Sequence, residues 1–263
     1  MTAQVASLAI PSGLRAVVTA GASGIGRAIA DALIANCARV MVSDIDRTAL
    51  DLFRAAHPEH AVSFADAASE TEMERLFGEA QSFLGGLDVL VNNAGIAGPT
   101  GRVEEISISE WRRTIDVCLT GQFLGAHFAV PMLKQAGGGS IVNLSSAAGR
   151  FGYALRSPYS AAKWGVVGFT QSLAKELGPD NIRVNAILPG VVAGPRIERV
   201  IAARAQQTGV SYADMEKSYL ARVSLRRMVT AQDVAGTVLW LVSASGANIS
   251  GQSLGVDGNV ESL

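Results

Sequence analysis

The sequence is poor in the residues that build metal sites and disulfide frameworks. It has two cysteines, Cys37 and Cys118, among 263 residues, with no C-x-x-C pair and no Cys/His cluster. It therefore predicts neither a metal site nor a disulfide scaffold. The three histidines, His57, His60 and His127, have no matching partners and are interpreted as structural or solvated.

The sequence also lacks a charge excess and a long apolar run. Its formal net charge is -1, and its charged residues are scattered without runs of one sign, which disfavours binding to nucleic acid or to an anionic membrane. No apolar run reaches the roughly 18 residues that span a bilayer, and the N-terminal segment has no basic region typical of a signal peptide. We expect a cytoplasmic protein whose partner is a small molecule.

The chain does contain enough apolar residues for one large core, 49% of the total. Strands that are apolar nearly throughout are typical of a parallel sheet covered by helices on both faces. Their regular alternation with helical patterns predicts one α/β domain over 1–263, a Rossmann-like, doubly wound parallel sheet of about seven strands with a core over about 14–258. Strands are predicted at 15–20, 38–44, 61–66, 87–95, 139–146, 182–190 and 253–258, and helices at 24–35, 47–56, 70–83, 109–134, 157–177 and 231–242, with a polar helical segment at 195–228.

A glycine-rich turn, TAGASGIG (19–26), joins the first predicted strand to its helix. Unpaired N–H groups and the positive end of the helix dipole attract a phosphate there, and glycine lets the phosphate approach closely. Taken alone, Gly21, Gly24 and Gly26 fit an ordinary tight turn equally well.

A carboxylate, Asp44, ends the second predicted strand, eighteen residues after the last glycine of that turn. At this position it would bond the ribose hydroxyls of an adenosine and repel a 2′-phosphate. Because neither Ser23 nor Ile45 is basic, NAD is favoured over NADP, and Arg47, the one nearby cation, counts against this preference. A helix-capping role for Asp44 is the alternative. Asp66, at the end of the third strand, is similarly placed to meet the adenine.

The segment SPYSAAKWG (157–165) sets Tyr159 and Lys163 one helical turn apart on one face. Tyrosine has an ordinary pKa near 10, too high for acid–base work at neutral pH. A lysine cation about 4 Å away, at an effective dielectric constant near 20, stabilises the phenolate by about 4 kcal/mol and so lowers its pKa by about three. A surface Tyr/Lys pair is the alternative. The surrounding small residues instead indicate close packing, and a chain with only four lysines places one of them here.

The fifth predicted strand ends in NLSSAAG (143–149). A hydroxyl there is placed to hydrogen-bond a substrate oxygen as hydride leaves or arrives. A serine at a strand end is, on its own, more often a cap.

Together these motifs resemble those of the short-chain dehydrogenase/reductase family, over about Leu14 to Gly258. The match rests on TAGASGIG (19–26), NNAG (92–95), SS (145–146) followed by YSAAK (159–163), PG (189–190) and VDG (256–258), in the family's order. Each motif alone is weakly specific, and the set is highly specific.

The resemblance implies an NAD(P)-dependent alcohol/ketone oxidoreductase with Tyr159 as general acid–base. Ser146, thirteen residues before the tyrosine as in the family, would orient the substrate. Lys163 would bind the nicotinamide ribose and lower the pKa of Tyr159. Asn92 and its neighbours would support the cofactor side of the sheet, and the backbone at Val192 would meet the carboxamide. The predicted cofactor-binding residues are Gly21, Ser23, Gly24, Ile25, Gly26, Asp44, Asp66, Ala67, Asn92, Ala94, Tyr159, Lys163, Pro189, Gly190 and Val192.

Three positions depart from the family pattern. Ala20 replaces the first glycine of the turn, which implies a slightly reshaped loop, and Asn259 replaces a frequent glycine. Cys118 stands where many members have an asparagine that holds a helix irregularity, whose backbone carbonyl positions a water next to the lysine. A thiol is a weak hydrogen-bonding substitute, so the proton relay would be slower or rewired. A redox-sensing thiol and a buried, inert cysteine are further interpretations, and the second of these is favoured.

Substrate specificity is expected in segment 191–228 and in the loop after Ser146. Arginine suits bidentate anion binding, so our hypothesis is that Arg150, Arg156 or Arg196 clamps a substrate carboxylate, sulfonate or phosphate. Solvated arginines, or arginines paired with acids such as Glu198, are the alternative.

The function predicted from these residues and the resemblance is reversible hydride transfer between NAD and a secondary alcohol, such as a sugar, polyol or hydroxy acid. A 3-oxoacyl-thioester reductase is one alternative, although it would prefer NADPH, which Asp44 disfavours. A non-catalytic dinucleotide-binding regulator or scaffold is another, although it would not need Ser146, Tyr159 and Lys163 together. The resemblance also implies a homotetramer or homodimer, joined through the long fourth helix and the helix of Tyr159.

Overall fold

The computed structural model describes residues 9–263, so residues 1–8, part of the N-terminal segment that was expected not to be a signal peptide, lie outside the described part. Seven parallel strands form one sheet in the order β3-β2-β1-β4-β5-β6-β7. This confirms the predicted doubly wound α/β fold, in which the strand order reverses beside β1. The strands are β1 (Arg15–Thr19), β2 (Arg39–Asp44), β3 (Ala61–Phe64), β4 (Val89–Asn92), β5 (Gly139–Leu144), β6 (Ile182–Pro189) and β7 (Ser253–Val256).

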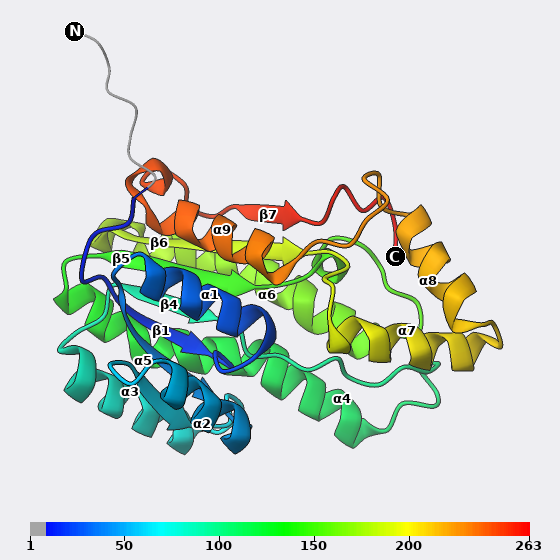
Figure 1. The fold of residues 1–263 in the computed structure, drawn as a ribbon, viewed down its shortest axis with the longest axis horizontal. Coiled ribbons are helices and arrows are strands. Elements are labelled where there is room, and N and C mark those ends of the chain that lie inside the picture. The colour runs from blue at the N-terminus through cyan, green and yellow to red at the C-terminus, as the bar shows by residue number, and fades with distance from the viewer. Residues whose placement is uncertain (1–8) are drawn as a thin grey trace, which may run out of the picture.

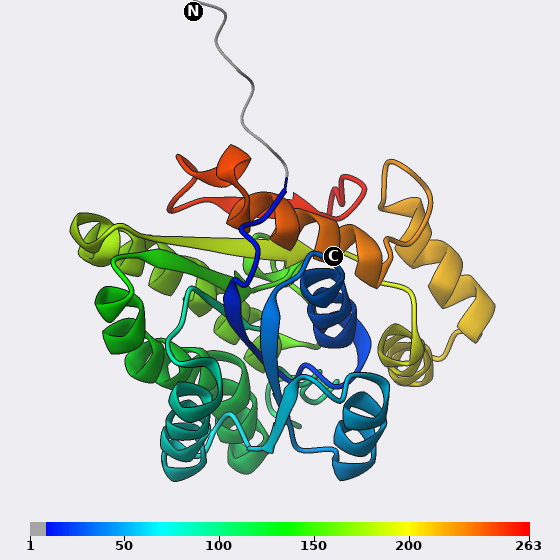
Figure 2. The same ribbon diagram turned by 60° about the vertical axis from the view of Figure 1, so that its left-hand side comes forward.

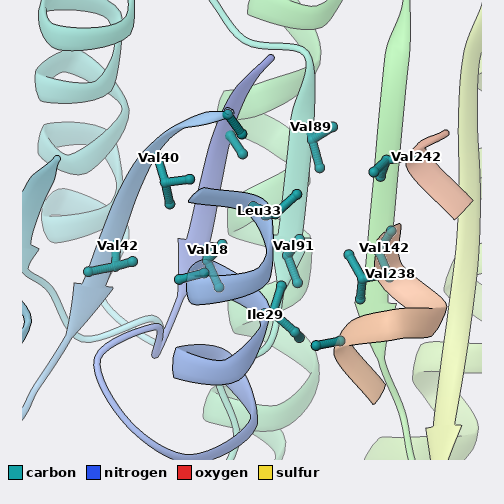
Figure 3. Close-up of a cluster of buried hydrophobic side chains, with 14 of the residues drawn as sticks. Val18, Ile29, Leu33, Val40, Val42, Val89, Val91, Val142, Val238 and Val242 are labelled. Atoms are coloured by element: carbon teal, nitrogen blue, oxygen red, sulfur yellow. The ribbon is translucent and has the colours of Figure 1, made fainter. Parts of the chain in front are cut away.

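Helices cover both faces of the sheet (Figure 1). They are α1 (Gly24–Ala35), α2 (Arg47–Ala56), α3 (Glu70–Leu84), α4 (Ile108–Ile115), α5 (Gly121–Gln135), α6 (Ser157–Leu177), α7 (Pro195–Thr208), α8 (Tyr212–Ala221) and α9 (Ala231–Val242). One buried core lies between the sheet and α1, α2 and α9. Figure 3 shows part of it, where valines from neighbouring strands meet Ile29 and Leu33 of α1 and Val238 of α9. A second core lies on the opposite face, under α3, α5 and α6.

Most strands end earlier at their carboxyl ends than the sequence predicts. β3, β4, β5 and β7 stop two or three residues before their expected ends at 66, 95, 146 and 258. The polar residues beyond these points leave the ladder and form loops. Since parallel strands present all their carboxyl ends at one edge of the sheet, these loops gather there.

Polar side chains fix where several helices begin. Ser107 and Glu110 form a capping box at α4, and Thr230 and Asp233 form another at α9. Such a box satisfies N–H groups that the first helical turn leaves unpaired. The helix predicted at 157–177 is α6, in which Ser157 is the first helical residue and Arg156 holds the cap position.

The single helix predicted over 109–134 is divided in two. A five-residue π-helix, Asp116–Thr120, separates α4 from α5 and contains Cys118. A π-helix inserts an extra residue into the turn, and it is a feature that recurs at functional sites.

The segment expected to be polar and helical forms two helices, α7 and α8, which share a small core of their own. Both lie beyond the carboxyl ends of the strands and stand apart from the two helical layers in both views (Figures 1 and 2). This placement explains why the segment has no apolar stripe of the kind that packs on a sheet. None of the described helices is long and apolar enough to cross a membrane.

The glycine turn contains one strained residue. Ala20 has φ +47°, in the left-handed region that glycine adopts without a Cβ penalty. The loop therefore keeps the backbone shape of a glycine at the position where the sequence departs from the family pattern.

Candidate active site

The predicted catalytic residues come together at the carboxyl edge of the sheet. Ser146 follows the end of β5, and Tyr159 and Lys163 lie on α6 with their side chains toward that edge. The Tyr159 hydroxyl is hydrogen-bonded to Ser146. The Ser146 hydroxyl also accepts from the backbone N–H of Ala148 at 3.1 Å, so the cap that was the alternative role is present alongside the contact to tyrosine.

Opposing effects act on the acidity of Tyr159. Burial disfavours the phenolate and by itself would raise the pKa, and a contribution from Cys118 acts in the same direction. The positive charges of Lys163 and Arg196, with the hydrogen bond from Ser146, act the other way and prevail. The pKa of Tyr159 therefore lies below the ordinary value of 10.0, in the direction that general acid–base work near neutral pH requires.

Lys163 is a buried cation without a carboxylate partner among the described residues. Its side chain is only 3% exposed, and its Nζ donates to the Leu144 carbonyl at 2.7 Å. The Nζ atom lies 5.7 Å from the centre of the Tyr159 ring. With no acid to neutralise it, the ammonium acts on the phenol at full charge.

Cys118 is fully buried in the π-helix, and its thiol is both hydrogen-bond acceptor and donor to the main chain of Ile96. Its Sγ accepts from the Ile96 N–H and donates to the Ile96 carbonyl, both at 3.4 Å. A Cβ built on Gly95 would lie 3.5 Å from Lys163 Nζ and 3.7 Å from Cys118 Sγ, so the thiol and the ammonium flank the same glycine. The thiol thus tethers the π-helix to the loop after β4.

The glycine turn leaves the start of α1 open. The side chain of Ser23 makes no capping bond there, and a Cβ on Gly24 would meet nothing within 4 Å. At Gly26, by contrast, a Cβ would lie 2.2 Å from the Ala20 carbonyl oxygen, so only glycine fits where the helix crosses the turn. Ser23 is exposed and Ile25 half-buried. Uncapped N–H groups beside open space suit a phosphate.

Asn93, for which no separate role was predicted, connects this turn to the end of β4. Its Nδ2 donates to the carbonyls of Thr19 and Ala20 at 3.0 and 2.9 Å. Thr19 Oγ1 in return accepts from the N–H groups of Asn93 and Ala94. The second asparagine of the NNAG motif is the sequence feature from which this role of Asn93 could have been predicted. The first of the pair, Asn92, is buried and donates to the Gln122 and Asn143 oxygens of the interior, so it supports the edge from below.

Asp44 is buried at the end of β2 and accepts from the N–H groups of Ala22 and Asp46 at 3.3 and 3.1 Å. These bonds hold the carboxylate beside the glycine turn. Ile45 is exposed, and Arg47 lies over the Phe64 ring at 3.9 Å. Arg47, the cation that the sequence places near Asp44, is therefore engaged with an aromatic face.

The remaining predicted cofactor residues line the same edge. Asp66, the carboxylate expected to face an adenine, forms an ion pair with Arg113 at 2.9 Å. Ala67 beside it is buried. After Pro189 ends β6, the N–H of Gly190 donates to the Val256 carbonyl at 3.0 Å. Val192 then forms an isolated parallel bridge with Val229, which brings α7 and the segment before α9 together.

The three candidate arginines differ sharply in their partners. Arg150 pairs with the buried Asp257 at 2.8 Å. Arg156 is 2% exposed, bonds to the Ala97 carbonyl, and lies 5.3 and 5.2 Å from the ring centres of Tyr153 and Tyr159. Arg196, in the first turn of α7, is exposed, and within the described chain it has no ion pair.

A tyrosine pair near the site was not predicted from sequence. The hydroxyls of Tyr153 and Tyr219 are hydrogen-bonded, and Arg204 lies over both rings. Burial raises the pKa of Tyr153 far above its ordinary value, so this phenol stays neutral. The cluster joins α7 and α8 to the loop that leads into α6.

The arrangement of Ser146, Tyr159 and Lys163 supports acid–base chemistry on a hydroxyl or carbonyl oxygen. Beside it lie the uncapped start of α1, which suits a phosphate, and the buried carboxylate of Asp44 at the end of β2. Residues 9–263 contain no group of three or more histidine, cysteine or acidic side chains able to hold a metal ion.

Comparisons with known proteins match this architecture. A family model described as enoyl-(acyl carrier protein) reductase matches residues 19–260. The chain is 36% identical over 253 residues to trans-4-hydroxycyclohexanecarboxylate dehydrogenase of Sinomonas cyclohexanicum, covering 92% of this chain and 91% of the relative. It is 35% identical over 248 residues to cyclohexanol dehydrogenase of Acinetobacter sp. (strain SE19), covering 92% and 93%.

Solved structures agree with the sequence relatives. NAD+-bound xylitol dehydrogenase superposes with a TM-score of 0.91 at 26% identity, covering 94% of this chain and 98% of that chain. Levodione reductase superposes with a TM-score of 0.88 at 29% identity, covering 94% and 97%.

Proposed function

Because the chain belongs to the short-chain dehydrogenase/reductase family, we propose that it transfers a hydride reversibly between NAD(H) and a secondary alcohol or ketone. The observation that carries the proposal is the Tyr159 phenol, whose pKa is lowered, between the Ser146 hydroxyl and the buried Lys163 ammonium. The relatives named as dehydrogenases of cyclohexanol and hydroxycyclohexanecarboxylate support a secondary alcohol as the substrate.

In this mechanism Tyr159 moves the proton. As phenolate it takes the hydroxyl proton of the alcohol, and as phenol it returns a proton to the ketone oxygen. Ser146 holds that oxygen by a hydrogen bond, and Lys163 stabilises the phenolate. Bound NAD supplies the acceptor for the hydride in oxidation, and its reduced form supplies the donor in reduction.

The residues present fit such a cofactor. The uncapped start of α1 with Gly24 offers N–H groups to the pyrophosphate, and Asp44 offers a carboxylate to the ribose hydroxyls. A carboxylate at this position also argues against a 3-oxoacyl-thioester reductase that depends on NADPH. A scaffold without catalysis would have no need of a buried, unpaired ammonium, which costs free energy.

Substitution of Tyr159 by phenylalanine tests the proposal. The ring keeps its packing but loses the proton carrier, so we expect turnover to fall by about 10²–10⁴-fold. In the wild type, oxidation needs the phenolate. The kcat/KM for oxidation should therefore rise with pH and level off at a pH below 10.0, because the pKa of Tyr159 lies below this ordinary value. Reduction needs the phenol, so its kcat/KM should fall over the same range.

The measurement is NADH absorbance across a panel of secondary alcohols and ketones. Tyr153→Phe is the matched control, because that phenol stays neutral and is bonded to Tyr219 away from Ser146. Full activity of Tyr159→Phe would refute the acid–base role, and a wild type inactive on the whole panel would favour the scaffold.

The preference for NAD is part of the proposal and depends on Asp44. Replacing this carboxylate by serine removes its bonds to ribose hydroxyls and its repulsion of a 2′-phosphate. We expect Asp44→Ser to lower the ratio of kcat/KM for NAD over NADP at least about tenfold. Steady-state kinetics with both cofactors would show this, and an unchanged ratio would contradict the assignment.

We also propose that the substrate can carry an anionic group, bound by Arg196. Of the three candidate arginines, Arg150 is neutralised by Asp257 and Arg156 is shielded by two tyrosine rings. Arg196 is exposed, and its charge reaches Tyr159. The relative that acts on a hydroxycyclohexanecarboxylate supports a carboxylate as that group.

The test compares 4-hydroxycyclohexanecarboxylate with its neutral carboxamide, at a pH on the alkaline plateau of the oxidation profile, where Tyr159 is ionised. Arg196→Gln should lower kcat/KM for the carboxylate by about 10- to 100-fold, the effect of one charge-assisted hydrogen bond, and change it little for the carboxamide. Arg199→Gln, an equal loss of charge one turn further along α7, should affect neither. Equal losses on both compounds would end the idea.

Cys118 is proposed to hold the π-helix through Ile96 in place of the family asparagine. It is buried, so its role is structural and it is not accessible to oxidants.

We further propose that copies of the chain associate through the outer face of α5 and α6. Phe123 and Trp164 are each 50% exposed there, and the rings of Phe123 and Phe169 lie 6.4 Å apart across the two helices. Exposed aromatic residues of this kind mark protein interfaces. Light scattering should give the mass of a dimer or tetramer, and Phe123→Glu should shift it toward the monomer. A wild-type monomer would contradict this.

A further inference from the structure

The buried ammonium of Lys163 is anchored by a single main-chain oxygen. The carbonyl of Leu144, the last residue of β5, accepts from Lys163 Nζ at 2.7 Å. No other hydrogen bond of this ammonium occurs within the described chain. The position of the ammonium relative to Tyr159 therefore depends on which lone pair of the Leu144 carbonyl oxygen is free to accept its hydrogen bond.

A second donor shares that oxygen. Nε2 of Gln122, in the first turn of α5, donates to the same Leu144 carbonyl at 3.0 Å. A carbonyl oxygen has two lone pairs, so the amide occupies one and leaves the other to the ammonium. The main chain of Gln122 is fixed as well, because its carbonyl accepts from Asn92 Nδ2 at 3.1 Å.

The Gln122 amide is a costly choice for a buried position. Gln122 is 1% exposed, and within residues 9–263 its Oε1 has no hydrogen-bond partner. A buried acceptor without a partner destabilises the fold, whereas an apolar side chain of the same shape would not. The orientation of the amide follows from the neighbouring carbonyl, since a flipped amide would set two oxygens against each other. Stability of the fold alone does not account for glutamine here.

We propose that Gln122 is a positioning residue for Lys163. By filling one lone pair of the Leu144 carbonyl, it directs the ammonium to the other and so holds it at its place beside the Tyr159 ring. This inference rests on the proposed function only for its kinetic readout.

The other groups around Tyr159 are fixed independently of Gln122. The charged and titratable groups that face this phenol are Lys163 on its own helix, Arg196 of α7 and Cys118 of the π-helix, and Arg156 lies over its ring. Of these, the Lys163 ammonium alone shares an acceptor with Gln122. A change at Gln122 should therefore reach Tyr159 through Lys163.

Gln122→Met tests the proposal, because it keeps the linear shape and removes the donor and the orphaned oxygen. With both lone pairs free the ammonium can move away, and a displacement of about one ångström raises the pKa of Tyr159 by a few tenths. We expect the pH profile of kcat/KM for oxidation to move by that amount toward alkaline pH, with kcat lower by about two- to tenfold. The melting temperature should stay unchanged or rise. Gln122→Leu is the second variant, should the methionine disturb folding.

Thr170→Val is the matched control. The buried Thr170 hydroxyl accepts from Asn143 Nδ2 at 2.9 Å, so this variant breaks a bond in the same interior network without touching Leu144. It should lower the melting temperature and leave the pH profile in place. A profile that moves equally in both variants, or in neither, would overturn the positioning role.

A readout without turnover separates this inference from the proposed function. Ultraviolet difference spectroscopy of the free protein, with Tyr159→Phe as the blank, follows ionisation of this phenol directly. A higher pKa in Gln122→Met supports the inference even if every alcohol tested is inert. An unchanged pKa in an active enzyme overturns it and leaves the proposed hydride transfer standing.

Discussion

The electrostatic interaction between the Lys163 ammonium and the Tyr159 phenol is the constraint around which the active edge is built. It depends on leaving a cation without a counter-ion in a nearly dry place, since a carboxylate at Lys163 would cancel the field that acidifies tyrosine. The structure supplies a neutral anchor instead, the Leu144 carbonyl. Burial of the pair strengthens the interaction and at the same time disfavours the phenolate. The net acidity of Tyr159 is thus the balance of these two effects of burial.

Among Arg150, Arg156 and Arg204, two likewise lie beside neutral groups, and the third pairs with a carboxylate. Arg150 forms an ion pair with the buried Asp257, and this pair connects the loop after β5 to the C-terminal segment. Arg156 and Arg204 lie over tyrosine rings, where the aromatic faces rather than acids receive the cations. The charges of Arg156 and Arg204 are therefore held near the site by aromatic rings, and none of the ion pairs within the described chain involves either arginine.

The sequence predicted what depends on local periodicity and on spacing within one element. The strands, the open turn at α1, and the shared face of Tyr159 and Lys163 follow from patterns of two to four residues. Contacts between distant segments could not be predicted in this way. Asn93, the residue after β4, bonds to the glycine turn more than seventy positions earlier in the sequence. Tyr153, in the loop before α6, bonds to Tyr219 of α8. The three arginines looked equivalent in sequence because their difference lies entirely in their partners.

The π-helix links two features that the sequence shows only as neighbours. Each residue of an α-helix turns the chain by about 100°, so an extra residue in the turn rotates every later side chain relative to every earlier one. Cys118 lies within the π-helix and reaches Ile96 in the loop after β4. Gln122 lies just beyond it and reaches Leu144 at the end of β5. Because Cys118 and Gln122 are four residues apart, the two side chains lie on nearly the same face of this helical segment, toward the ends of β4 and β5. One helical segment therefore holds both the loop beside Lys163 and the carbonyl that anchors the ammonium.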